Sequence, residues 1–343
     1  MRSAGLRPLT ENLDVPDDAY ADGASTLKTI ELLNEFDRNN KNFFLTVGFQ
    51  KPHLPFTPPK KYWDLYQRDD IKLAEFQSKS IGSPQEAYHQ SGELRNYHDT
   101  EPSMDENGIV NEAKQRELIH GYMASVSFID AQVGMILDHL ESTGMDENTV
   151  VVFFGDHGWH LGDHGLWNKH SNFEEATRTP LIFRSPDIDG GFVNDSPVEL
   201  LDIFPTVCTL AGIPKPDDLD GISLVPILEK KSEYLRDFAI SQYPRRCNVM
   251  RSVIGRYPDD CTLMGYAVRN EKYRYVAWIS GDFEDRSDFN NDEIVMEELY
   301  DYEIDPLETK SYASDASYQK VKEEMIKDLR SVISVSYTHL RAH

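Results

Sequence analysis

Cysteine is scarce in this chain, with three residues among 343. So few thiols exclude a small scaffold held together by disulfides. Cys247 and Cys261 flank one loop and would be able to pair in an oxidising compartment, but spacing alone does not establish the geometry of a bond. Cys208 lies in an apolar stretch and is interpreted as a buried thiol.

Long apolar runs are missing as well. No stretch approaches the roughly 18 apolar residues that a membrane-spanning helix needs. The first eight residues contain no apolar core of a secretory signal peptide. We therefore expect neither a membrane span nor a signal peptide within this sequence.

Positive charge is also in short supply. The chain has 35 basic and 59 acidic residues, which gives a formal net charge of −24. Nucleic acid is therefore excluded as the expected partner, because phosphate binding requires a basic surface. The overall charge still allows an anionic substrate in a locally basic pocket. Hydrophobic residues make up 39% of the chain, enough to bury a sizeable core.

What the sequence does contain is a group of reactive side chains after the apolar run 149–155. The run is typical of a buried strand. Asp156 and His157 follow it directly, and Lys169 comes later in the same polar segment. In open α/β sheets, ligands bind beyond the carboxyl ends of strands. A carboxylate beside an imidazole suits a divalent cation, and a lysine suits an anion; the alternative is a polar turn.

A second apolar run, Phe43–Phe49, predicts another strand. It leads into the segment 50–56, which carries Lys51 and His53. His53 lies between two prolines, so a rigid structural turn is the alternative to a binding role.

Helical periodicity indicates the rest of a layered α/β body. In the predicted helix 112–141, apolar residues recur at alternating spacings of three and four. Because the strand 149–154 follows at once, the two form a helix-to-strand unit. Further predictions are a helix at 24–38, a strand at 180–184, a short helix at 198–212, and a long surface excursion over 67–110.

The pattern changes after the stretch 214–233, which is rich in Pro, Asp and Lys. We predict an α/β body over residues 1–233 and a smaller C-terminal α+β subdomain over 234–335. Residues 336–343 fit neither pattern and are interpreted as a non-native tail. Within the subdomain the predicted elements are strands at 238–243, 264–269, 273–278 and 298–300, a hairpin joining the second and third, and a helix at 316–333.

Several of these segments, taken in order, resemble the sulfatase family and, within it, the iduronate-2-sulfatase branch. Residues 155–173 resemble the metal-and-sulfate segment of that branch, and residues 48–56 its substrate segment. The resemblance extends from about residue 12 to about residue 330 through further motifs: 220–224, 241–245, 264–266 with 273–275, 298–301 and 305–306.

The resemblance implies an alkaline-phosphatase-like α/β sandwich with a mixed central sheet and a smaller C-terminal subdomain. It also implies sulfate ester hydrolysis by a formylglycine made from Cys, with a bound Ca²⁺ that neutralises charge on the sulfate oxygens. By motif, Asp156 and His157 correspond to two calcium ligands, although many sulfatases have Asn at the position of His157. Lys169 corresponds to the ammonium group that binds sulfate, and His53 to a sulfate hydrogen-bond donor.

Other residues are candidate contacts to a sulfated glycosaminoglycan or another sulfate ester. Lys51 is one of them; the alternative interpretation is that its side chain points away from the site. Trp159 either lines the sugar site or packs in the core. Arg245 and Arg256 suit the carboxylate of a uronate, but Arg245 equally suits a structural ion pair. The alternative for Lys169 is a solvated lysine.

The sequence departs from the family at the nucleophile. No Cys-x-Pro/Ala-Ser-Arg motif is present, and none of the three cysteines has the required neighbours. The acidic metal-ligand pair that precedes this motif is also absent, since Asp17 and Asp18 fall after the point where the family's ligands occur. The chain therefore resembles the C-terminal two-thirds of a sulfatase, lacking the first strands of its sheet.

We accordingly predict a sulfuric ester hydrolase that removes sulfate from uronate residues of glycosaminoglycans, represented by an incomplete chain that is inactive alone. The resemblance implies a lysosomal or secreted location. One alternative is a non-catalytic protein that binds sulfated glycans. The other is a phosphohydrolase on the same fold, which would need an Asp-x-x-x-His metal pattern that is not clearly present.

Overall fold

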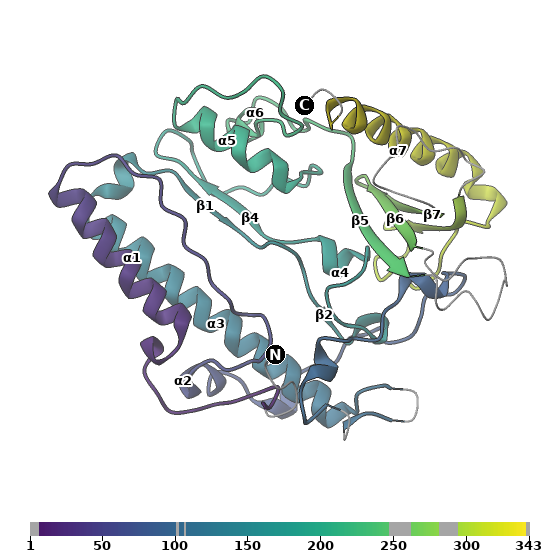
Figure 1. Cartoon of the computed structure of the whole chain (residues 1–343), viewed down its shortest axis with the longest axis horizontal. Coiled ribbons are helices and arrows are strands. Elements are labelled where there is room, and N and C mark those ends of the chain that lie inside the picture. The colour runs from purple at the N-terminus through teal and green to yellow at the C-terminus, as the bar shows by residue number, and fades with distance from the viewer. Residues whose placement is uncertain (1–6, 101–102, 106–107, 247–261, 281–293, 341–343) are drawn as a thin grey trace. The chain divides into compact units, whose positions relative to one another are not determined.

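The computed structural model describes residues 7–100, 103–105, 108–246, 262–280 and 294–340. The chain forms two compact units (Figure 1). The first comprises Met1–Glu75, Gln90–Thr149 and Leu161–Asn168, and the second comprises Phe76–His89, Val150–His160 and Lys169–His343. The division expected at residue 233 remains a prediction.

Three helices come first, mixed helices and strands follow, and the last part of the described chain has four consecutive strands and a helix. Among the described residues, no helix combines the length and the apolar content that a membrane crossing requires. The helices are α1 (Ala21–Arg38), α2 (Lys60–Trp63), α3 (Glu112–Thr143), α4 (Glu174–Thr177), α5 (Ile203–Leu210), α6 (Val225–Leu228) and α7 (Gln319–Leu340); the strands are β1 (Val151–Phe154), β2 (His160–Leu161), β3 (Trp167–Asn168), β4 (Leu181–Arg184), β5 (Ala239–Arg246), β6 (Thr262–Arg269), β7 (Tyr273–Ser280) and β8 (Ile294–Asp301).

Helices α1 and α3 pack against each other and form the framework of the first unit (Figure 1). Both helices were predicted, and α3 has clear end signals. The Asn111 side chain accepts a hydrogen bond from the Lys114 amide at 3.0 Å, which caps the first turn. Gly144 follows the last turn with φ of 73°, a left-handed conformation that glycine adopts without steric cost.

The apolar row predicted along α3 is only partly buried. Val126, a member of that row, is 44% exposed, whereas Leu118 and Phe128 from the neighbouring row are fully buried. Phe128 and Ile129 pack against the aromatic side chains of α2. Which row of side chains on a helix is buried depends on where the neighbouring elements pack against that helix.

The predicted strand 43–49 pairs with no other segment in the described part of the chain, so the prediction of a sheet strand is wrong for this structure. The side chains still alternate as in a strand. The odd-numbered residues from 43 to 49 are half-buried, and the even-numbered ones between them are exposed. The local sequence favours an extended backbone whose side chains point alternately to opposite sides. Hydrogen-bonded pairing into a sheet requires a second strand.

Asp17 ties three elements of the first unit together. Its carboxylate lies 2.8 Å from the Lys61 ammonium group, and it accepts hydrogen bonds from Tyr62 at 2.8 Å and Gln132 at 3.0 Å. Burial acts to raise the pKa of Asp17, but the hydrogen bonds from these three partners outweigh it and hold the pKa below its ordinary value of 3.8.

We expect Asp17→Asn to lower the free energy of unfolding by about 1–2 kcal/mol at pH 7, because charged hydrogen bonds are replaced by neutral ones. A carboxyl group with a lowered folded pKa contributes stability above its unfolded pKa and loses it as the pH falls through the folded value. The deficit of the variant should therefore shrink below about pH 3.8. Urea unfolding at several pH values measures it.

The adjacent exposed Asp18 provides the matched control. Asp18→Asn should change stability by less than about 0.5 kcal/mol at any of these pH values. A deficit for Asp17→Asn that stays constant from pH 7 to pH 3 would contradict the electrostatic explanation.

In the second unit, β1 and β4 form an antiparallel ladder in which Val152 lies opposite Phe183. Strands were predicted at both places. Strand β1 is less buried than a run of six apolar and β-branched residues suggests, since Phe154 is 47% exposed and Ile182 of β4 is 57% exposed. Two strands leave much of both faces of a sheet uncovered.

The C-terminal subdomain is built on an antiparallel sheet with the order β5-β6-β7-β8. The predicted hairpin is present, with Ala267 of β6 opposite Val276 of β7. Helix α7 packs on one face of this sheet through Met325 and Leu329 (Figure 1). Helix α7 extends to Leu340, past the predicted end at 333.

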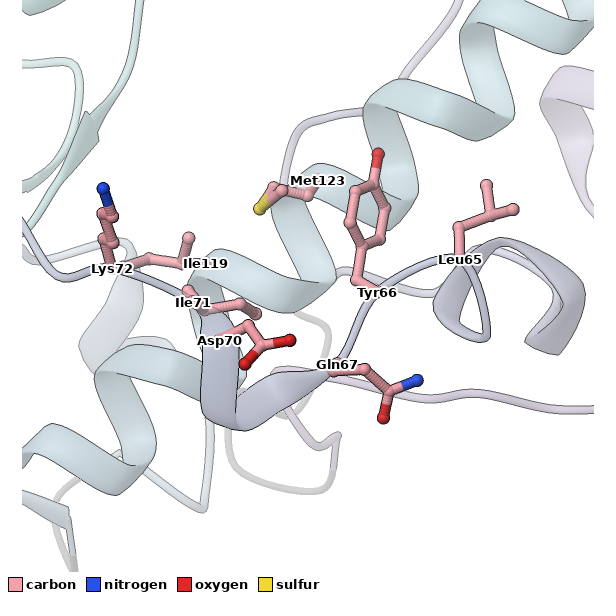
Figure 2. Close-up of a pocket in the computed structure, with 8 residues that line it drawn as sticks. All are labelled: Leu65, Tyr66, Gln67, Asp70, Ile71, Lys72, Ile119 and Met123. Carbon is pink, nitrogen blue, oxygen red and sulfur yellow. The ribbon is translucent and has the colours of Figure 1, made fainter.

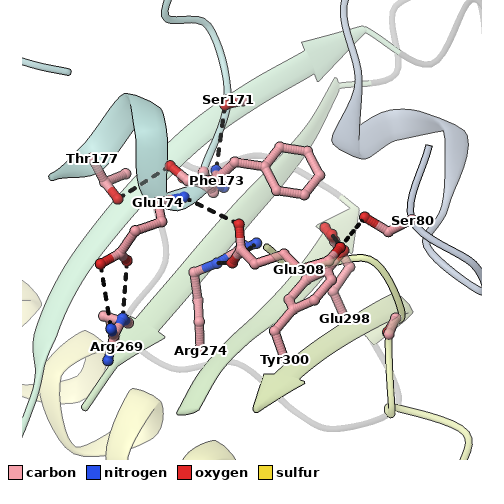
Figure 3. Close-up of polar contacts among 12 residues, drawn as sticks. Ser80, Ser171, Phe173, Glu174, Thr177, Arg269, Arg274, Glu298, Tyr300 and Glu308 are labelled. Atoms are coloured by element: carbon pink, nitrogen blue, oxygen red, sulfur yellow. Dashed lines mark hydrogen bonds and ion pairs between the residues drawn. The ribbon is translucent and has the colours of Figure 1, made fainter. Parts of the chain in front are cut away.

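The other face of this sheet buries a polar network (Figure 3). The Arg274 guanidinium and the Glu308 carboxylate lie 2.6 Å apart, and their side chains are 2% and 1% exposed. Glu298 accepts hydrogen bonds from Tyr300 at 2.6 Å and from the Trp278 indole at 2.8 Å. Burial raises the pKa of Glu298 despite these donors. The network joins β7 and β8 to the segment that carries Glu308.

Candidate active site

The segment after β1 is held in place by backbone contacts within the second unit. The Gly155 amide donates to the Pro180 carbonyl at 3.1 Å, and the Gly158 amide donates to the Ala176 carbonyl at 2.9 Å. A Cβ atom at Gly158 would lie 2.0 Å from the Glu175 carbonyl oxygen, so only glycine fits at this position. This close approach fixes the direction of the two residues before it, Asp156 and His157.

Asp156 and His157 present two metal-ligand groups to the same place. Their closest side-chain atoms, Asp156 Oδ2 and His157 Nε2, lie 3.7 Å apart, and the Asp156 side chain is 85% exposed. His157 Nδ1 lies 2.7 Å from the Gly158 carbonyl oxygen. Since a carbonyl oxygen only accepts, Nδ1 carries the proton, and in the neutral ring Nε2 keeps its lone pair. A carboxylate oxygen and an imidazole lone pair therefore converge.

Trp159 and Lys169 lie beside this pair. The rings of His157 and Trp159 are nearly parallel, with centroids 6.1 Å apart. The Lys169 ammonium nitrogen lies 5.3 Å from the centre of the Trp159 ring, a cation–π contact. The structure thus brings together the four predicted site residues of the polar segment. A carboxylate, an imidazole and an ammonium group therefore lie beside an aromatic ring.

Arg245 contacts both backbone carbonyl oxygens and the ring of Tyr243, whose centre lies 4.4 Å from the guanidinium carbon. Its guanidinium donates to the carbonyl oxygen of Glu86 at 2.9 Å and to that of His170. Burial lowers the pKa of Arg245. Tyr243, on the same strand, lies 2.7 Å from His170 Nδ1 through its hydroxyl. These contacts anchor the residue next to Lys169, which makes Arg245 a positioning residue in this geometry; its predicted contact with a uronate stays a prediction.

Lys51 and His53 belong to the first unit. Lys51 is 8% exposed and donates to the His53 carbonyl oxygen at 3.0 Å, and burial lowers the pKa of its ammonium group. The Asp22 carboxylate accepts the amides of Gln50 and Lys51 at 2.8 and 3.1 Å. His53 Nδ1 donates to the Leu54 carbonyl oxygen, and His53 Nε2 lies 3.8 Å from Glu93. Lys51 therefore supports the loop that carries His53.

Sequence reasoning did not single out Asp22 or His160. Asp22 holds the loop before His53, and the only sequence signal for it is an acid in the first turn of α1. His160 is fully buried, and its Nε2 lies 2.7 Å from Ser171 Oγ. Nothing in the sequence distinguishes it from the neighbouring histidines. The predicted contact of Arg256 and the possible bond between Cys247 and Cys261 lie outside the described residues.

A cavity of about 560 Å³ lies beside α3 in the first unit (Figure 2). Its lining combines apolar side chains from α3 with a mixed polar and apolar segment. The predicted site residues are not among those that line it, so the cavity carries no part of the proposed chemistry. The lining residues are Leu65, Tyr66, Gln67, Asp70, Ile71, Lys72, Ile119 and Met123.

The donor set at the end of β1 fits a divalent cation. Ca²⁺ prefers oxygen ligands such as a carboxylate. An imidazole nitrogen is a ligand that also occurs in transition-metal sites. Asp156 and His157 would hold the ion, with at least two further ligands needed to complete its shell. Formylglycine does not fit this chain in the same way, because no cysteine occurs in the required motif.

Comparison with known proteins places this chain in a family. The family model described as Sulfatase matches residues 4–213, and the model described as N-sulphoglucosamine sulphohydrolase, C-terminal, matches residues 162–334. The chain is 31% identical to iduronate 2-sulfatase of Mus musculus over 355 residues and to that of Homo sapiens over 359 residues. Each match covers 89% of this chain and 64% of the relative, so the chain spans less than two thirds of the relatives' length.

Structural comparison supports the same assignment at the level of the fold. A solved structure of BT4656 in complex with its substrate D-glucosamine-2-N,6-O-disulfate matches with a TM-score of 0.68 and 21% identity, covering 91% of this chain and 69% of that chain. The predicted fold, an alkaline-phosphatase-like α/β architecture with a C-terminal subdomain, is confirmed. The chain therefore belongs to the sulfatase family.

Proposed function

We propose that residues 1–343 carry the sulfate-binding part of a sulfuric ester hydrolase of the iduronate-2-sulfatase type, which removes sulfate from uronate residues of glycosaminoglycans. The observation that carries the proposal is the convergence of Asp156, His157, Trp159 and Lys169 at the end of β1. The 31% identity to two iduronate 2-sulfatases supports the choice of sugar. A lysosomal or secreted location is part of the same proposal.

Charge explains why these side chains suit a sulfate ester. The ester group is an anion whose departing oxygen gains negative charge as the S–O bond breaks. The Lys169 ammonium group offsets charge on the sulfate oxygens. A divalent cation held by Asp156 and His157 would supply Lewis-acid stabilisation of the same oxygens. Trp159 offers its ring to an apolar face of the sugar, while its contact with Lys169 limits the positions of the ammonium group.

His53 would contribute a hydrogen bond in a particular protonation state. Its Nδ1 proton is used by the Leu54 carbonyl oxygen, so in the neutral ring Nε2 is an acceptor. Donating to a sulfate oxygen therefore requires the doubly protonated ring. The Glu93 carboxylate lies 3.8 Å from Nε2.

We propose that this chain alone binds a sulfated uronate without hydrolysing it, since the sequence contains no nucleophile motif. With Ca²⁺ present, we expect calorimetry to show binding of a 2-O-sulfated uronate disaccharide and ion chromatography to show no sulfate release. Lys169→Ala should weaken the binding by roughly tenfold or more, because a charged contact to sulfate is lost.

The control variant is Lys215→Ala, which removes an exposed lysine elsewhere in the second unit. It should bind the disaccharide as the unmodified chain does. Equal affinities for the two lysine variants would contradict the role of Lys169. Sulfate release that disappears in Asp156→Ala would contradict the proposed inactivity.

A further inference from the structure

We propose that one face of strand β5 fixes the position of the sulfate-binding Lys169, with Tyr243 as the central positioning residue. This role rests on the proposed function, since it concerns how the same site is held. It gives the motif 241–245 a purpose as a unit. All the residues involved belong to the second unit.

Every second side chain of β5 contacts the segment that follows Lys169. The odd-numbered residues from 241 to 245 are half-buried, and the even-numbered residues between them are exposed. A strand with one covered face has this period of two. The half-buried side chains are those of Ser241, Tyr243 and Arg245, and each forms a hydrogen bond with residue 170 or residue 172.

His170, the residue directly after Lys169, is held at both its backbone and its side chain. The Arg245 guanidinium donates to the His170 carbonyl oxygen, and the Tyr243 hydroxyl lies 2.7 Å from His170 Nδ1. The guanidinium carbon of Arg245 also lies 4.4 Å from the centre of the Tyr243 ring, so these two side chains restrain each other. The Tyr243 hydroxyl thus links β5 to the imidazole next to Lys169.

Asn172 is fixed by β5 and β6 together. It is 5% exposed, its Nδ2 donates to the Gly265 carbonyl oxygen at 2.9 Å, and its Oδ1 accepts from the Ser241 hydroxyl at 3.2 Å. Gly265 lies opposite Tyr243 in the ladder of β5 and β6. A Cβ atom at Gly265 would lie only 3.0 Å from Asn172 Nδ2, so the missing side chain makes room for the amide.

These anchors reach Lys169 through a tight turn. The Ser171 amide donates to the Lys169 carbonyl oxygen at 2.7 Å, and the Ser171 hydroxyl lies 2.7 Å from His160 Nε2. The backbone of Lys169 is therefore fixed from its C-terminal side, with the ammonium nitrogen 5.3 Å from the centre of the Trp159 ring. Since a lysine side chain is long and flexible, a fixed backbone reduces the conformational freedom lost when the ammonium group binds sulfate.

The first test locates Lys169 without any ligand. The full chain is labelled with lysine carrying ¹³C at Cε, and the Lys169 signal is assigned by its loss in Lys169→Arg. The ring current of Trp159 should shift the ε-methylene signal upfield, and Trp159→Leu should remove the shift. Tyr243→Phe keeps the ring beside Arg245 but removes the hydroxyl, so the signal should move towards its position in Trp159→Leu. Gln242→Ala, on the exposed face of β5, should leave it unchanged.

The second test measures the affinity for the 2-O-sulfated uronate disaccharide by calorimetry with Ca²⁺ present. Tyr243→Phe should weaken binding roughly threefold to tenfold, the range expected for one lost hydrogen bond, while Gln242→Ala should bind as the unmodified chain does. In a chain that already carries Lys169→Ala, Tyr243→Phe should have no further effect, because it acts through Lys169. A merely structural role would weaken binding equally in both backgrounds.

Three results would overturn the positioning role. One is a Lys169 signal in Tyr243→Phe that matches the unmodified chain. Another is a Lys169 signal that does not depend on Trp159 in the first place, and the third is an equal loss of affinity in both backgrounds. Absence of disaccharide binding by the unmodified chain would count against the proposed function instead, and the Lys169 signal would still decide the role of Tyr243.

Discussion

Replacing Glu308 by alanine is expected to lower the free energy of unfolding by about 3–5 kcal/mol, since a buried charge is left without its partner. Arg274 lies 2.6 Å from Glu308, and both side chains are almost completely buried. Burial alone would lower the pKa of Arg274, but the Glu308 carboxylate reverses this and raises it. Arg274 still stays charged when Glu308 is removed, because a guanidinium group is not deprotonated in proteins. Urea unfolding followed by far-UV circular dichroism measures the loss.

Two controls separate the charge effect from a general sensitivity of this region. Glu303 forms an exposed ion pair with Lys272, with 2.8 Å between the carboxylate oxygen and the ammonium nitrogen and both side chains about half exposed. Glu303→Ala should therefore lower the free energy of unfolding by less than about 1 kcal/mol. A double variant, Arg274→Met with Glu308→Leu, should recover most of the stability, since an apolar pair has no unpaired charge to bury. A loss for Glu308→Ala no larger than that for Glu303→Ala would contradict this account.

The second large effect concerns metal binding. We expect Asp156→Asn to reduce the affinity for Ca²⁺ at least roughly tenfold, because it removes a carboxylate charge while keeping the shape of the side chain. The Asp156 side chain is 85% exposed, and the contact found for it among the described residues is the approach to His157. Isothermal calorimetry with Ca²⁺ measures the affinity directly.

Asp187→Asn is the matched control, because Asp187 is an exposed aspartate in the loop after β4. Its replacement changes the net charge by the same amount at a distance from the site. If both variants bind Ca²⁺ equally, the long-range charge explains the affinity and Asp156 is no ligand. A selective loss in Asp156→Asn supports the assignment of the end of β1 as part of the metal site.

Much of the candidate site was accessible from residue order. Asp156 and His157 directly follow a strand, and the apolar run before them predicts that strand. The proximity of Lys169 to Trp159 was not predictable in the same way, since ten residues and two short strands separate them. The role of Arg245 was left open by the sequence. Only the folded chain shows its guanidinium bound to backbone carbonyl oxygens.

In the first unit, too, side-chain contacts could not be predicted from the sequence alone. The lysine at position 51 was an obvious candidate for sulfate contact because it lies beside His53. In the structure it is buried and donates to the loop backbone, so its part in any contact remains a prediction. Asp22, which holds the same loop, lies 29 residues before Lys51, and its only sequence signal is that of an acid in the first turn of a helix.

The sequence by itself determined most of the longer helices and strands, the antiparallel hairpin of β6 and β7, and the family, because these follow from local periodicity and from motifs with fixed spacing. The tertiary structure alone decided which segments pair. It placed Arg274 against Glu308, buried Lys51, and left 43–49 extended without a neighbouring strand. The physical reason is that backbone conformation depends mainly on nearby residues, whereas pairing and burial depend on segments far along the chain.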